Sequence, residues 1–170
     1  MYLAHFGLNE LPFSITPDAQ FVYEGSSHQG ALNTLMIAYR SGEGFIKVTG
    51  EVGTGKTLLC RRFLASLDAQ SVAAYIPNPM QEPRALLASV AEELGAEPGN
   101  DAAFLIKSIN RRLFDLAAEG KSALVCIDEA QTTPPLTLES LRLLSNLETE
   151  KRKLLQIILI GQPELDEKLA

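Results

Sequence analysis

The segment that decides the fold is "TGEVGTGKTLLCRRFL", from Thr49 to Leu64, in which a glycine-rich stretch turns abruptly into a run with helical spacing. The apolar segment "GFIKVTG" at residues 44–50 predicts a short strand, and apolar residues from Leu58 to Leu67 recur at the spacing of a helix. Glycine costs backbone entropy in any ordered element. Glycines at a strand-to-helix junction therefore indicate that another group approaches the backbone closely.

Phosphate is the group that fits this junction. Residues 50–57 match the pattern G-x-x-x-x-G-K-[ST] at every fixed position. In such a loop, successive backbone N–H groups surround the phosphates of a nucleotide, and the positive end of the following helix adds to the attraction. Lys56 is expected to reach the β- and γ-phosphates of ATP, and Thr57 to place its hydroxyl on Mg²⁺. The residues predicted to bind the nucleotide are Gly50, Glu51, Val52, Gly53, Thr54, Gly55, Lys56, Thr57 and Leu58.

Two adjacent carboxylates follow another apolar segment, "ALVCI", at residues 123–127. Its unbroken apolar run is typical of a parallel strand that is covered on both faces. Asp128 is expected to hold Mg²⁺ through water, and Glu129 is the candidate general base that polarises the attacking water. The alternative, from these residues alone, is that the two acidic side chains cap the next helix.

Gln162 directly follows the apolar segment "LLQIILIG", residues 154–161. Ligands of open parallel sheets bind at the carboxyl ends of the strands, where the phosphate loop and the two carboxylates also fall. We therefore expect the Gln162 side chain to face the γ-phosphate and to act as a sensor of hydrolysis. An ordinary loop glutamine is the alternative.

Strand-like and helix-like segments alternate along the chain with short connections, which predicts a parallel sheet covered by helices. The expected class is a three-layer α/β fold in one domain over residues 1–170. Residues 1–25 are expected to be an irregular lead, after which Ser26 or Ser27 caps the first helix. The last helix, from Pro163, has no stop signal before the chain ends, which indicates a fragment. Further strands are expected at 71–76 and 122–129, and further helices at about 82–94, 101–119 and after residue 135.

The composition is that of a globular protein, with 46% hydrophobic and 21% charged residues. A formal charge of −6 and a pI near 5.0 argue against a general attraction to nucleic acid or to an anionic membrane. The cysteines form no metal-binding or disulfide pattern, and no signal or membrane segment is present, so a cytoplasmic protein is expected. His5 and His28 are expected to be structural, with His28 in the first turn of a helix.

With these residues in place, the chain resembles the ExeA/GspA group of AAA+ ATPases, which is associated with bacterial secretion and type IV pili. Within that group it is most similar to the ATPases of mannose-sensitive haemagglutinin (MSHA) pilus biogenesis. The resemblance covers nearly the whole chain. It rests on "HFGLNELPFSITPD", "GEGFIKVTGEVGTGKTLLCRRFL", "YIPNP", "CIDEAQ", "LRLLSNLET" and "KLLQIILIGQPEL".

The resemblance implies a P-loop NTPase of AAA+ (ASCE) type that is truncated before a fifth strand, an arginine finger and a helical lid. It implies Mg²⁺-dependent ATP hydrolysis in a homo-oligomer that acts on pilus or secretion assembly proteins from the cytoplasmic side of the inner membrane. The isolated fragment is then expected to be weakly active. The alternatives are a DNA-associated regulator of the transposition type, a P-loop kinase, and a scaffold that binds ATP without turnover.

Overall fold

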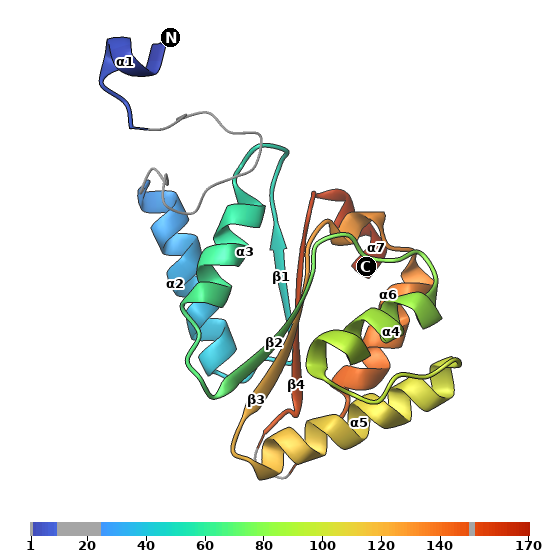
Figure 1. Ribbon diagram of the computed structural model, residues 1–170. Helices are drawn as coiled ribbons and strands as arrows, with labels where there is room; N and C mark the ends of the chain where they lie inside the picture. Colours follow the sequence, from blue (N-terminus) through green and yellow to red (C-terminus); the bar gives the residue numbers. More distant parts are fainter. Residues whose placement is uncertain (1, 10–24, 150–151) are drawn as a thin grey trace.

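Four parallel strands form the centre of the molecule in the order β1-β4-β3-β2 (Figure 1). The structure, a computed structural model, describes residues 2–9, 25–149 and 152–170. The strands are β1 Phe45–Thr49, β2 Ser71–Ile76, β3 Ser122–Ile127 and β4 Leu155–Gly161. The helices are α1 Tyr2–Phe6, α2 Ser26–Arg40, α3 Lys56–Ala65, α4 Pro83–Leu94, α5 Ala102–Ala118, the 3₁₀ turn η1 Ala130–Thr132, α6 Pro135–Ser145 and α7 Glu164–Leu169.

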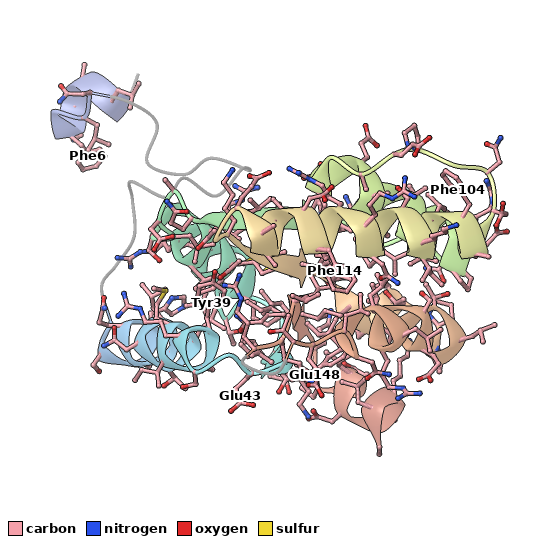
Figure 2. The ribbon with its side chains drawn as sticks, turned by 90° about the horizontal axis from the view of Figure 1, so that it is seen from below. Phe6, Tyr39, Glu43, Phe104, Phe114 and Glu148 are labelled. Carbon is pink, nitrogen blue, oxygen red and sulfur yellow. The ribbon has the colours of Figure 1, made fainter. Side chains whose placement is uncertain are left out.

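Helices cover both faces of the sheet, so the molecule has three layers (Figure 1). On one face α2 and α3 pack on the sheet around Phe63, and the ring of Tyr39 on α2 meets Phe63 edge-on with 5.7 Å between ring centroids. Figure 2 shows Tyr39 beside α2, and Phe114 beside α5. On the other face α4, α5 and α6 bury a larger apolar cluster. This arrangement confirms the predicted α/β class.

The parallel register brings the carboxyl ends of the strands to one edge. Thr49 pairs with Gly161 at the ends of β1 and β4, and Ile127 pairs with Ile76 at the ends of β3 and β2. β4 is buried along its whole length, because it is a central strand with helices on both faces. The loops that follow β1, β3 and β4 therefore meet at this edge.

Local sequence signals determine where helices begin and end in the layer formed by α4, α5 and α6. The Asp101 side chain accepts a hydrogen bond of 2.8 Å from the Phe104 backbone N–H and so caps α5. Gly95, with φ of 70°, ends α4 in the left-handed conformation that glycine adopts without strain. None of the helices in the described part of the chain combines the length and the apolar character that crossing a membrane requires.

Two local predictions are wrong. Gly25, rather than Ser26 or Ser27, occupies the N-cap of α2, and no side chain caps that helix. The lead is not irregular throughout, since Tyr2–Phe6 form a short helix. At its end the Leu8 N–H donates a hydrogen bond of 2.8 Å to the Leu3 carbonyl. Most of the predicted lead, residues 10–24, lies outside the described residues.

The packing of α5 yields a stability prediction with a neighbouring control. Leu113 is fully buried, whereas the next residue, Phe114, is 52% exposed. Leu113→Ala should lower the free energy of unfolding by about 2–5 kcal/mol, because it removes packed atoms and leaves a cavity. Phe114→Ala should lower it by less than about 1 kcal/mol. Urea unfolding followed by circular dichroism measures both, and equal losses would contradict the orientation of α5.

Candidate functional site

A cavity of about 300 Å³ lies at the edge of the sheet where the predicted site residues meet. Its size is at the lower end of the range for small-molecule sites, about 300–1,000 Å³. Its lining comes from the glycine-rich loop, the first turn of α3, and the residues that follow β3 and β4. The lining residues are Val52, Gly53, Gly55, Lys56, Thr57, Leu58, Glu129 and Gln162.

The glycine-rich loop folds around the carbonyl of Glu51. That carbonyl accepts hydrogen bonds from the Thr54 N–H at 3.3 Å, the Thr54 hydroxyl at 2.8 Å and the Lys56 ammonium at 2.7 Å. Lys56 therefore lies against the loop, where its remaining N–H donors can turn to an anion. Gly50 joins the loop to the sheet through its N–H, which donates to the Gly161 carbonyl at 3.2 Å.

The other two glycines have left-handed backbone conformations, with φ of 79° at Gly53 and 81° at Gly55. Both conformations are costly for residues with a Cβ. The two positions differ in their surroundings. A Cβ at Gly53 would meet nothing within 4 Å, whereas one at Gly55 would lie 2.7 Å from the ring of His28.

His28 touches the loop, a contact that no sequence signal indicated. It lies in the first turn of α2, as predicted, and its Nε2 is 2.8 Å from the Thr54 carbonyl oxygen. Because a carbonyl only accepts hydrogen bonds, Nε2 carries the proton in this contact. The imidazole therefore ties the first turn of α2 to the loop.

Asp128 lies directly behind Thr57 and is only 2% exposed. Its Oδ2 accepts a hydrogen bond of 2.6 Å from the Thr57 hydroxyl, and its Oδ1 accepts one of 2.9 Å from the Glu129 N–H. The two residues predicted to serve the metal are therefore in contact. The alternative, in which the two acidic side chains cap the next helix, does not hold for Glu129, whose side chain makes no capping hydrogen bond to η1.

Tyr75, on β2, is a third neighbour of Asp128 that the sequence analysis missed. Its hydroxyl donates to Asp128 Oδ2 at 3.4 Å. Burial, together with the negative charge of Asp128, raises the pKa of Tyr75 to about 12. The phenol therefore stays protonated at neutral pH and remains a hydrogen-bond donor to the carboxylate.

Glu129 and Gln162 both line the cavity, on opposite sides of Gln131. Glu129 has a left-handed backbone, with φ of 53° and ψ of 35°, which turns the chain sharply at the end of β3. Its carboxylate Oε2 accepts a hydrogen bond of 2.6 Å from the Gln131 amide. Gln162 follows β4, and its backbone N–H donates to Gln131 Oε1 at 3.1 Å.

The residues present fit a nucleotide with Mg²⁺. The hydroxyl of Thr57 and the carboxylate of Asp128 supply the hard oxygen ligands that Mg²⁺ prefers, directly or through water. Lys56 and the N-terminus of α3 face the cavity with positive charge and backbone N–H groups, as a phosphate chain requires. Gly50 keeps the loop compact, since a Cβ there would lie 2.9 Å from the Thr54 hydroxyl.

Comparison with known families identifies the family of the chain. The sequence model of the AAA domain matches residues 39–169, from the end of α2 to α7. The chain belongs to the AAA domain family. The resemblance to AAA-type ATPases, which rests on segments quoted from nearly the whole chain, is confirmed at the level of the family.

This AAA domain is similar to the General secretion pathway protein A of Aeromonas hydrophila, with 45% identity over 99% of the chain. The chain spans 31% of that relative's length. This similarity supports the predicted resemblance to the ExeA/GspA group. It does not confirm the more specific resemblance to ATPases of MSHA pilus biogenesis.

Two solved structures share the fold. Cdc6p from Pyrobaculum aerophilum has a TM-score of 0.65 at 18% identity, and covers 91% of this chain and 43% of its own. The ADP form of the Aeropyrum pernix ORC2 protein has a TM-score of 0.62 at 17% identity, and covers 92% of this chain and 46% of its own. At such low identity the likeness establishes the P-loop fold alone.

The two glycines of the loop provide a matched test of the His28 contact. Gly53→Ala and Gly55→Ala should each lower the free energy of unfolding by about 1–2 kcal/mol through backbone strain. Gly55→Ala should lose more, because its Cβ also collides with the His28 ring.

The His28→Ala/Gly55→Ala double variant should recover part of that extra loss, since the ring is gone. Urea unfolding of Gly53→Ala, Gly55→Ala, His28→Ala and the double variant measures the coupling between His28 and Gly55. Equal losses for the two glycines, or strictly additive effects of His28 and Gly55, would show that the imidazole does not pack on the loop.

Proposed function

We propose that this AAA domain binds ATP with Mg²⁺ and hydrolyses it to ADP and phosphate. The observation that carries the proposal is the hydrogen bond between Thr57 and Asp128, because it joins the phosphate loop to the end of β3 beside Glu129. A cavity lined by Lys56, Glu129 and Gln162 in front of this pair has the groups for binding, water activation and sensing.

Each residue has a defined task in this proposal. The loop N–H groups and Lys56 hold the phosphates, while Thr57 and Asp128 hold Mg²⁺, which supplies charge neutralisation on the phosphate oxygens. Glu129 accepts a proton from the attacking water, because it is the carboxylate that lines the cavity while Asp128 lies behind Thr57. Gln162 lies at the end of β4, where its side chain senses the γ-phosphate.

The similarity to the secretion relative supports a proposal for the cellular role. Similarity to a general secretion pathway protein supports a place in type II secretion or in the related assembly of MSHA-type type IV pili. We infer that the chain is the nucleotide-binding part of a longer cytoplasmic protein that works as a homo-oligomer at the inner membrane. In that assembly, hydrolysis would be coupled to a change in the secretion or pilus proteins that it contacts.

Two substitutions separate ATP binding from ATP hydrolysis. They are made in the longer protein proposed above, called the full chain from here on. Lys56→Ala should weaken Mg-ATP binding by about 10- to 100-fold, because it removes charge-assisted hydrogen bonds to phosphate. Glu129→Gln should keep the affinity and lower the turnover by about 100-fold or more, because an amide cannot take the proton. Calorimetry and phosphate release measure the two effects.

Lys107→Ala, on the exposed face of α5, is the control for loss of one positive charge and should match the parent. Unchanged ATP affinity in a folded Lys56→Ala protein would remove the phosphate-loop assignment. Hydrolysis at the parent rate by Glu129→Gln would remove Glu129 as the base.

A further inference from the structure

Gln131, on the turn η1, bridges two residues of the site. Its Nε2 donates to Glu129 Oε2 at 2.6 Å, and its Oε1 accepts from the Gln162 backbone N–H at 3.1 Å. Both the nitrogen and the oxygen of the side-chain amide therefore make hydrogen bonds. Its orientation is determined, because a flipped amide would set its oxygen against the carboxylate and its NH₂ against the Gln162 N–H.

The end of β4 is shaped to receive this amide. A Cβ at Gly161 would lie 2.6 Å from Gln131 Oε1 and 3.2 Å from the Gln131 backbone nitrogen. The missing side chain of Gly161 thus leaves room for the bridge. Gly161 has no positive φ, so close approach rather than backbone conformation explains the glycine at this position.

The turn that carries Gln131 is fixed from two further sides. Thr132 donates to the Glu129 carbonyl through its N–H at 3.0 Å and its hydroxyl at 2.8 Å. The Lys168 ammonium, on α7, donates to the carbonyls of Gln131 and Thr133. These bonds offset the cost of the left-handed backbone at Glu129.

We propose that Gln131 is a positioning residue that holds the Glu129 carboxylate against the end of β4, an inference that rests on the hydrolysis proposed above. By binding Oε2, the amide fixes the carboxylate plane and leaves Oε1 to accept the proton of the attacking water. By binding the Gln162 N–H, it ties the direction of the base to the residue proposed as sensor. A shift of the β4 end then moves the base.

The test uses Gln131→Met in the full chain, because methionine has a similar length and lacks both hydrogen bonds. The matched control is Gln81→Met. Gln81 donates to the Thr132 carbonyl at 3.0 Å, so it supports the same turn without touching Glu129. Each variant is also made together with Glu129→Gln, which completes a double-mutant cycle.

Three quantities are measured: exchange of the Gln162 amide hydrogen without nucleotide, Mg-ATP affinity, and the single-turnover rate of hydrolysis. Gln131→Met should speed exchange at Gln162, keep the affinity within about twofold, and slow hydrolysis by about 10- to 100-fold, within the range that acid–base groups contribute. In the Glu129→Gln background it should slow hydrolysis no further. Gln81→Met should leave all three near the parent values.

Hydrolysis by Gln131→Met at the parent rate would overturn the inference while leaving the proposed function intact. An equal loss in both backgrounds, or a parallel loss of ATP affinity, would also overturn it and would indicate a purely structural role. A parent protein that binds ATP without any turnover would instead contradict the proposed function, and this inference with it.

Discussion

The hydrogen bond from the Thr57 hydroxyl to Asp128 is the contact on which the site depends, because it joins residues 71 positions apart in the sequence. A second contact between the same two elements lies beneath it, where the sulfurs of Cys60 and Cys126 are 3.6 Å apart. Thr57 and Cys60 are three residues apart on the helix, and Cys126 and Asp128 are two residues apart on the strand side, so each pair lies on one face of its element. The first turn of α3 and the end of β3 therefore face each other in only one register.

Left-handed backbone conformations occur on both sides of this contact. Gly53 and Gly55 are left-handed in the loop, and among the described residues Glu129 is the one non-glycine residue with positive φ. Such conformations persist where the surrounding structure fixes them. Here the fully buried strand β4 and the buried strand β3 provide that rigid support, while Glu129 and Gln162, which follow these strands, line the cavity.

The layers, and the meeting of the phosphate loop with Glu129 and Gln162 at one edge of the sheet, could be predicted because both follow from local patterns. Apolar runs marked β3 and β4, and the fixed spacing from Gly50 to Thr57 marked the loop. His28, Tyr75 and Gln131 were not predicted as site residues. His28 and Tyr75 reach the site from α2 and β2, and Gln131 reaches it through hydrogen bonds of its side chain. No spacing of residues in the sequence predicts these contacts. The predicted serine cap of α2 failed because Gly25 occupies that position.

The most direct test of the Thr57–Asp128 site is the Mg²⁺ dependence of ATP affinity, measured by titration with and without the metal. In Asp128→Asn the increase in affinity that Mg²⁺ brings should fall by about tenfold or more, as for other partners of metal ligands, while metal-free ATP binding stays unchanged. Asp115→Asn, on the exposed face of α5, should keep the full increase. A folded Asp128→Asn protein with the parent's Mg²⁺ dependence would contradict the metal site at the end of β3.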